Sequence, residues 1–168
     1  MPMNDEPLLD DSPPSSNPGS DVEDQIRRLL HERPFGVLST QAQGQPYASL
    51  IAFAFTSQLR AFFFSTPRAT RKFKLLSQCD RVALLVDDRC LHPDHFMEVQ
   101  GVTITGRARQ IPPDSQDWEI ARASLLERHA QLRDFLAAPT TALFRVDVVR
   151  AFHVSRFQQV FQWIPPPE

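Results

Sequence analysis

Six residues that can bind an anion lie within a nine-residue stretch of the chain: Thr66, Arg68, Thr70, Arg71, Lys72 and Lys74. The stretch joins the end of an expected strand to an expected short helix over residues 69–78. Free backbone N–H groups at a helix start favour an anion, and guanidinium and ammonium groups add paired donors and a point charge. Cations at this end of a helix are unfavourable unless an anion offsets them. The pattern therefore indicates a phosphate site, and a solvated basic helix face is the alternative.

The elements around this cluster are predicted to be mainly strands. Runs rich in aromatic and β-branched residues predict strands at 35–41, 47–55, 59–65, 81–87, 96–110, 141–149 and 151–163. A helix is expected from Ser20 or Asp21 to Pro34, and further helical segments between 112 and 139. Six or so mostly antiparallel strands with peripheral helices favour a closed or split β-barrel over a parallel layered sheet. Gly101 and Gly106 are expected at bulges or bends of the long strand.

Composition indicates one folded domain behind a polar tail. The chain has 168 residues, which is enough for a single core. Residues 1–20 are rich in Pro, Ser and Asp and contain no Lys or Arg, so this acidic tail is expected to be disordered, with docking to a partner as the alternative. The folded domain is expected over residues 21–168. Without the tail the net charge changes from −2 to about +2, which is too small to indicate nucleic-acid binding.

The cysteines and the hydropathy pattern bear on location. Cys79 and Cys90 have no close metal or redox spacing, which favours a reduced, cytoplasmic chain. No apolar run approaches the roughly 20 residues of a membrane span, and no signal peptide is evident. Cys90, His92, His95 and Glu98 are close enough in sequence to be written as metal ligands, but a polar loop is the expected structure there and no metal is expected.

Motifs for self-contained catalysis are missing from the sequence. There is no Gly-x-Gly-x-x-Gly or Walker-type loop, so the chain has no nicotinamide-binding domain of its own. There is also no Gly-x-Ser-x-Gly elbow and no plausible nucleophile–base pair, so no catalytic residue is identified. Any chemistry is therefore expected to come from a bound cofactor.

The order of elements over residues 35–87 resembles a known family. Three strand-like runs (Phe-Gly-Val-Leu-Ser-Thr, Pro-Tyr-Ala-Ser-Leu-Ile-Ala-Phe-Ala-Phe and Ala-Phe-Phe-Phe-Ser-Thr) lead into the basic helix Thr-Arg-Lys-Phe-Lys-Leu-Leu, and the run Arg-Val-Ala-Leu-Leu-Val follows. This order is similar to that of the FMN-binding split barrel of the pyridoxamine 5'-phosphate oxidase-like proteins. The similarity covers most of residues 22–163.

The resemblance implies a homodimer with FMN in a groove between the subunits. The basic pair of the helix would contact the FMN phosphate, the second strand would place its backbone beside the flavin ring, and a polar residue on the long strand and an aromatic residue near the chain end would approach the ring. Arg156 and Phe157 are weaker candidates for this last role, and barrel-lining or core positions are the alternatives. The implied cofactor-binding residues are Ser49, Leu50, Ile51, Ser65, Thr66, Arg71, Lys72, Gln100 and Trp163.

The resemblance also implies two-electron flavin chemistry on a small-molecule substrate. Pyridoxamine phosphate oxidation itself is not expected, because the sequence stops soon after Trp163 without the further Arg- and His-containing segment of those oxidases. Three alternatives stay open: a deazaflavin-dependent reductase, a haem-utilisation or haem-binding protein with His153 as a possible ligand, and a non-catalytic flavin carrier or sensor.

Overall fold

Each strand-forming run of the sequence contributes to a strand in the computed structural model, which describes residues 20–156 and 159–166. The predicted disordered tail lies outside these residues, except for Ser20. The elements in chain order are α1 (Ser20–Glu32), β1 (Phe35–Ala42), β2 (Gln45–Phe55), β3 (Ala61–Pro67), α2 (Arg71–Leu76), β4 (Arg81–Asp87), η1 (Arg89–Leu91), η2 (Phe96–Glu98), β5 (Gly101–Gln110), α3 (Gln116–Arg128), η3 (Ala130–Leu132), α4 (Arg133–Ala137), β6 (Thr141–Ser155) and β7 (Gln159–Trp163). Within the described part of the chain, no helix has the length and apolar character needed to cross a membrane.

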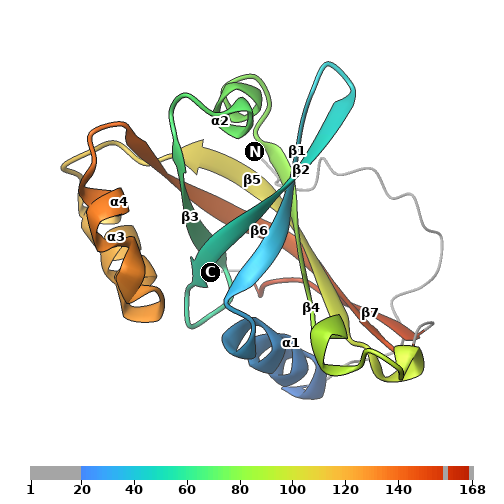
Figure 1. Ribbon diagram of the computed structural model, residues 1–168. Helices are drawn as coiled ribbons and strands as arrows, with labels where there is room; N and C mark the ends of the chain where they lie inside the picture. The colour runs from blue at the N-terminus through green and yellow to red at the C-terminus, as the bar shows by residue number, and fades with distance from the viewer. Residues whose placement is uncertain (1–19, 157–158, 167–168) are drawn as a thin grey trace.

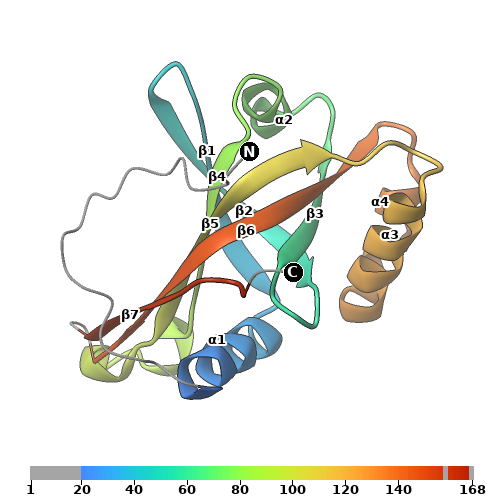
Figure 2. The ribbon, with the colours of Figure 1, turned by 180° about the vertical axis from the view of Figure 1, so that it is seen from behind.

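The strands form one antiparallel sheet that closes into a barrel (Figures 1 and 2). Their order is β3-β2-β1-β4-β5-β6-β7, and β3 also pairs with β6, so that six strands close the ring and β7 extends the sheet beyond it. Closing the ring through the β3–β6 pairing protects edges that an open sheet would expose. The predicted mainly β split barrel with peripheral helices is therefore confirmed.

Strand β6 is the longest element and belongs to both the barrel and the extension. Its first half pairs with β3 from Thr141 to Asp147, and its last residues pair with β7 from Ala151 to Ser155. The two strands predicted over 141–149 and 151–163 are thus one continuous strand followed by a short one. The strand predicted from residue 96 begins at Gly101 instead, because Phe96–Glu98 forms a 3₁₀ turn.

Two glycines fit special backbone positions. The hairpin between β1 and β2 turns at Gln43 and Gly44, both with positive φ, as a two-residue turn of the type favoured between twisted strands requires. Gly106 lies at the register shift between β5 and β6, where a Cβ atom would come within 2.5 Å of the Asp147 carbonyl oxygen. The bulge predicted at Gly106 is confirmed, whereas Gly101 lies in regular pairing.

Successive side chains of β3 point into two different apolar clusters. Phe62 and Phe64 pack into the main core, which fills the barrel and extends under α1, whereas Phe63 packs into a second cluster under α3 and α4. Side chains of a strand point alternately to opposite faces, and helices cover the outer face here (Figure 1). Strand β3 is therefore buried on both faces, which explains its nearly continuous run of apolar residues.

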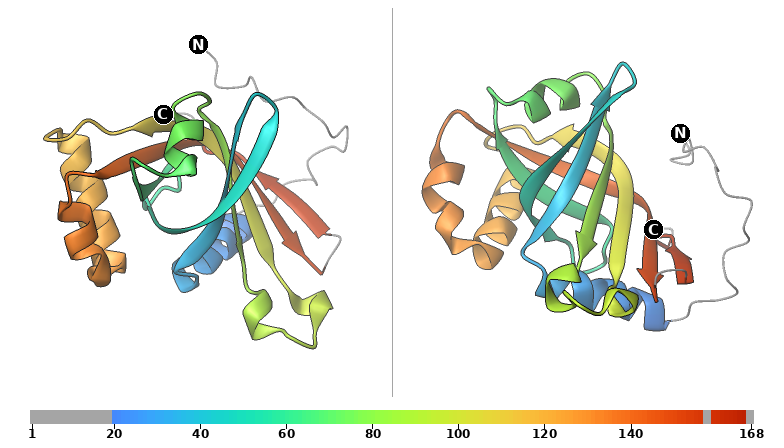
Figure 3. Two further views of the ribbon diagram at one scale, coloured as in Figure 1. Left: turned by 45° about the horizontal axis from the view of Figure 1, so that its top comes forward. Right: turned by 45° about the vertical axis from the view of Figure 1, so that its right-hand side comes forward.

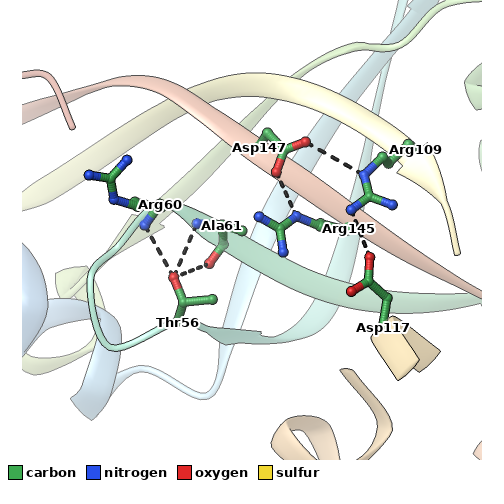
Figure 4. Close-up of polar contacts among 7 residues, drawn as sticks. All are labelled: Thr56, Arg60, Ala61, Arg109, Asp117, Arg145 and Asp147. Atoms are coloured by element: carbon green, nitrogen blue, oxygen red, sulfur yellow. Dashed lines mark hydrogen bonds and ion pairs between the residues drawn. The ribbon is translucent and has the colours of Figure 1, made fainter. Parts of the chain in front are cut away.

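Charged contacts fasten α3 to the sheet. Arg109 of β5 lies 2.8 Å from Asp117 of α3 and 3.6 Å from Asp147 of β6, and Asp147 also accepts a 2.6 Å hydrogen bond from Arg145 (Figure 4). The hydrogen bond from Arg109 holds the pKa of the Asp117 carboxyl below its usual value. At the other end of α3, Arg128 donates to the carbonyls of Leu30 and Arg33, at the end of α1.

Candidate functional site

Helix α2 is positioned by a chain of hydroxyl groups. Thr70 caps the helix, its Oγ1 accepting from the Phe73 N–H at 3.2 Å while it donates to the Pro67 carbonyl at 2.9 Å. The Oγ1 of Thr66 lies 2.9 Å from the Oγ1 of Thr70. Because the single proton of Thr70 goes to Pro67, Thr66 is the donor in that pair. The side chain of Thr66 is buried, so its hydroxyl holds the cap in place, whereas Ser65 beside it is only half-buried.

Three cations gather around the start of α2 without an acidic partner. Arg71 lies over the ring of Tyr47 at 5.3 Å, and Arg68 lies over the ring of Phe73 at 5.8 Å. Lys72 is half-buried, and its burial lowers the pKa of the ammonium group below 10.5. The first turn contains no acidic residue, and none of the three cations forms an ion pair with a carboxylate of the described residues. The helix is only six residues long, so these side chains supply most of the positive charge.

The barrel is split beside this cluster. Strand β2 pairs with β1 from Gln45 to Ala52, but its other edge pairs with β3 only from Phe53 to Phe55. The outer edge of β2 over residues 45–52 therefore has no strand partner in the described structure. Helix α2 lies across the opening between β3 and the β1–β2 hairpin (Figures 1 and 3). The opening combines free main-chain donors and acceptors with a basic helix, which suits a ligand with both a phosphate and a polar ring.

The three candidate residues on β2 face two directions. Ile51 is buried in the core, Leu50 is 69% exposed on the outside of the barrel, and Ser49 is half-buried. The Oγ of Ser49 is shielded from solvent and has no hydrogen-bond partner among the described residues. A buried hydroxyl without a partner is uncommon in folded proteins, and it marks this part of β2 as a place where a polar ligand group would be accommodated.

Gln100 and Trp163 lie away from this cluster. The backbone N–H of Gln100 donates to Asp88 at 2.7 Å, in the loop region of η1 and η2 at the opposite end of the barrel from α2 (Figure 1). Trp163 is 9% exposed in the main core, and its Nε1 donates to Glu23 of α1 at 3.3 Å. The structure thus joins β3 to the start of α2 through Thr66 and Thr70 and brings Arg71 to Tyr47 of β2, but within one chain it does not bring Gln100 or Trp163 to them. The weaker candidate Phe157 lies outside the described residues.

His153 is buried on β6, and its ring has one free nitrogen. Its Nε2 lies 3.2 Å from the side-chain oxygen of Gln100, whereas its Nδ1 has no hydrogen-bond partner in the part of the chain that the structure describes. Burial lowers the pKa of His153, although the Asp88 carboxylate acts in the opposite direction. The neutral form with a proton on Nε2 fits both observations. Among residues 20–156 and 159–166, no three His, Cys, Asp or Glu side chains form a group suited to a metal ion.

The sequence reasoning missed Tyr47 as part of the site. Its ring lies under the Arg71 guanidinium, although the two residues are 24 positions apart in the chain. Tyr47 is the only tyrosine of the chain, and this was the one available signal. The pairing of a hairpin strand with the helix start could not be read from local sequence.

Comparisons with known proteins agree on the fold. The sequence profile described as pyridoxamine 5'-phosphate oxidase matches residues 22–155. No curated protein sequence matches the chain.

The similar solved structures include haem-binding proteins and an FAD-binding protein. One is the haem storage protein HutZ from Vibrio cholerae, with a TM-score of 0.66 and 23% sequence identity; the match covers 75% of this chain and 89% of that one. Another is an FAD-binding protein from Mesorhizobium loti, with a TM-score of 0.61 and 16% identity; the match covers 77% of this chain and 91% of that one. A third is a haem-binding protein from Mycobacterium smegmatis, with a TM-score of 0.74 and 18% identity. The match covers 84% of this chain but only 57% of that longer protein.

Proposed function

The chain belongs to the pyridoxamine 5'-phosphate oxidase family, and from this premise we propose that it is an FMN-binding flavoprotein that oxidises or reduces a small molecule. The cofactor would lie in the opening between β2 and α2. Bound FMN would supply two-electron chemistry at its ring, and the chain's own residues would hold the phosphate, orient the ring and shape the substrate pocket.

The observation that carries this proposal is the environment of Lys72. Its ammonium group is half-buried and has no carboxylate partner among the described residues, and two further cations, Arg68 and Arg71, lie beside it. Burying an uncompensated charge is unfavourable, and such groups collect at functional sites. A phosphate group between Arg71 and Lys72 would neutralise the cluster through charge-assisted hydrogen bonds.

The free edge of β2 supports the placement of the ring. Main-chain N–H and C=O groups along residues 45–52 lack a strand partner there, and they match the alternating donors and acceptors of a flavin ring. The shielded Ser49 hydroxyl, which lacks a partner, lies on the same segment. The ring would therefore lie along β2, with its phosphate end toward α2.

We further infer that the flavoprotein acts as a homodimer. Leu50, Val37 and Leu85 lie side by side across β2, β1 and β4 on the outside of the barrel, and Phe35 lies next to them with 48% of its surface exposed. These residues line a shallow cavity of about 290 Å³. A second copy would cover this face, and only a second copy could bring Gln100 or Trp163 to the flavin.

Haem binding is the second candidate. Two of the similar structures are described as haem-binding or haem-storing, and the Nδ1 of His153 is a buried nitrogen without a partner. This candidate is the weaker one because His153 is fully buried, so the barrel wall would have to open before an iron atom could reach it.

The test is an FMN titration of the variant Arg71→Ala/Lys72→Ala, followed by quenching of flavin fluorescence. Each lost charge-assisted bond should weaken binding by about 1.5–3 kcal/mol, or roughly ten- to hundredfold. Lys74→Ala is the matched control, because Lys74 is an exposed cation of the same helix and should leave the affinity unchanged. Unchanged FMN affinity in the double variant, with the fold intact by circular dichroism, would overturn the proposal.

A further inference from the structure

An arginine-rich patch lies on the outer face of the sheet, across β4, β5 and β6. In Figure 2, β5 and β6 run side by side, with α1 below them and α3 and α4 to one side. The residues next to these arginines in the strands pack into the main core, so the arginines point outward; these core residues are Val82, Ala108, Val146 and Ala151. We call the patch the arginine face, and its members are Arg81, Arg107, Arg109, Arg145 and Arg150.

Like charges lie directly opposite each other at two places on the arginine face. Arg81 of β4 pairs in register with Arg107 of β5, and Arg109 of β5 pairs with Arg145 of β6. Side chains at directly opposite positions of an antiparallel pair are close neighbours, and like charges there are destabilising. Each pair therefore requires nearby negative charge to offset the repulsion.

At the Arg109–Arg145 pair, two carboxylates supply the offsetting charge. Asp147 lies 3.6 Å from Arg109 and 2.6 Å from Arg145, and Asp117 lies 2.8 Å from Arg109 (Figure 4). Two guanidinium groups and two carboxylates make this end of the arginine face neutral as a unit.

The other end of the arginine face has a surplus of positive charge. Asp80 lies 2.9 Å from Arg107. Arg150 belongs to the same end, because it pairs with Thr105, two positions along β5 from Arg107. The charges of the described residues at this end are thus three guanidinium groups, those of Arg81, Arg107 and Arg150, and the carboxylate of Asp80.

The segment 1–19, which lies outside the described residues, has the complementary charge. It contains no Lys or Arg and has four acids, which are Asp5, Glu6, Asp10 and Asp11. It joins the described structure at Ser20, the first residue of α1. No other stretch of similar length in the sequence combines four acids with the absence of Lys and Arg.

The length of this segment allows it to reach the arginine face. Helix α1 lies beside the end of β6, since Gln25 and Ser155 line one cavity, and a strand rises roughly 17 Å from Ser155 to Arg150. An extended chain covers up to roughly 3.5 Å per residue, so the nine residues from Ser12 to Ser20 span up to roughly 30 Å. The four acids, which all precede Ser12, therefore lie within reach of the face.

We propose that the acidic segment 1–19 binds the Arg81–Arg107 end of the arginine face of its own chain. Its carboxylates accept charge-assisted hydrogen bonds from the guanidinium groups and offset the repulsion between the paired arginines. The bound segment screens a basic surface that attracts phosphate-rich partners when it is bare. The face shares no residue with the Arg71–Lys72 cluster, so this contact is independent of FMN binding.

The experiment measures paramagnetic relaxation on the full chain. A nitroxide is attached at Ser12→Cys in a Cys79→Ser/Cys90→Ser background, and ¹H–¹⁵N NMR reads the broadening of backbone amides. At low salt the amides at the Arg81–Arg107 end should be broadened, and those of α4 should not. Raising the salt from about 0.1 M to about 1 M shortens the screening length from ~10 Å to ~3 Å and should remove at least about half of the broadening.

Changing the charge of either partner should weaken the contact. Arg81→Glu reverses one charge of the face and should lower the broadening at least about threefold. Arg133→Glu is the matched control, because Arg133 is an exposed arginine of α4, and it should leave the broadening unchanged. Replacing the four acids by their amides keeps the length of the segment and should also lower the broadening at least about threefold. This fourfold variant is Asp5→Asn/Glu6→Gln/Asp10→Asn/Asp11→Asn.

Three results would overturn the proposal. The first is no broadening of the arginine face at low salt, and the second is equal broadening in the Arg81→Glu and Arg133→Glu variants. The third is broadening that is as strong when the nitroxide is on a different chain, in a mixture of ¹⁵N-labelled chains without it and unlabelled chains that carry it. That result would mean that the segment binds a second copy. The salt series needs only the Arg81 and Arg107 of the wild type, so it decides the question even where a variant does not fold.

Discussion

Lys72 shows how a single residue connects burial to function. This ammonium group is half-buried, and no carboxylate of residues 20–156 and 159–166 pairs with it, an arrangement that lowers stability and is typical of binding sites. Arg71 differs because its guanidinium is exposed and rests on the ring of Tyr47. The two neighbours therefore contribute differently: Lys72 gives a desolvated point charge, and Arg71 gives an oriented pair of donors.

The lowered pKa of Lys72 predicts a pH dependence of FMN binding. The phosphate favours the protonated amine, so the affinity for FMN should be constant below the lowered pKa and should fall as pH rises through it. This fall should begin at a pH below 10.5, the ordinary pKa of lysine. Without FMN, the stability of the protein should change with pH in the opposite direction to the FMN affinity. Between the two pKa values the unfolded chain binds more protons, so stability should rise with pH there. Titrations of FMN and of denaturant across alkaline pH check both signs.

The control for this pH dependence is Lys72→Met, which keeps the length of the side chain without its charge. It should lose both pH-dependent steps and gain roughly 0.5–1 kcal/mol of stability at neutral pH. The same pH profile in wild type and in Lys72→Met would show that another group is responsible.

Tyr47 is expected to act on FMN through Arg71. Tyr47→Ala removes the ring under the guanidinium and should weaken FMN binding roughly two- to fivefold, the size of an exposed cation–π contact. Tyr47→Phe retains the ring and should bind FMN as the wild type does. Fluorescence titration of both variants checks this; an equal loss in both would mean that the phenol hydroxyl, and not the ring, contributes.

At the scale of elements, the site depends on where β2 stops pairing with β3. The sequence predicted both strands and the basic helix, because alternation of apolar residues and Pro or Gly breaks mark them locally. It could not predict the free edge of β2, since pairing between strands is set by the whole sheet. In the structure Arg71 of α2 lies against Tyr47 of β2, whereas Gln100 and Trp163 lie elsewhere in the chain; the roles that the resemblance implies for these residues stay predictions.

The β5 bulge offers a test of the barrel geometry. Gly106→Ala would place a Cβ atom 2.5 Å from the Asp147 carbonyl oxygen and 2.6 Å from Val146 Cγ1, so it should cost about 1–3 kcal/mol of stability. Gly101→Ala on the same strand meets nothing closer than 3.7 Å and should stay within about 0.5 kcal/mol of wild type. Urea denaturation compares them, and equal stabilities would contradict the close packing at the bulge.

At the scale of the whole molecule, the outer face of the barrel is asymmetric. Helices α3 and α4 cover one side, whereas no described element covers Val37, Leu50 and Leu85 on the side formed by β2, β1 and β4. An uncovered apolar row beside a charged opening is typical of an interface between subunits. Local sequence could not reveal this row, because each residue alone reads as an ordinary strand position.

Disruption of this face should dissociate the proposed dimer. Leu85→Glu introduces a charge into the apolar row and should weaken dimerisation about thirtyfold or more, and FMN affinity should fall with it. Ile120→Glu is the matched control, because Ile120 is an apolar residue of α3 with 48% exposure and lies on another side of the molecule. Analytical ultracentrifugation of both variants decides: a Leu85→Glu protein as dimeric as the wild type would place the interface elsewhere.

The most direct test of the central claim is the absorption spectrum of the purified protein, followed by mass spectrometry of the compound that heat releases. We expect the two visible bands of an oxidised flavin and the mass of FMN, either as isolated or after addition of FMN, and the loss of both in Arg71→Ala/Lys72→Ala. A Soret band without flavin would favour haem and His153. A colourless protein that does not take up added FMN would contradict the assignment of the α2 site.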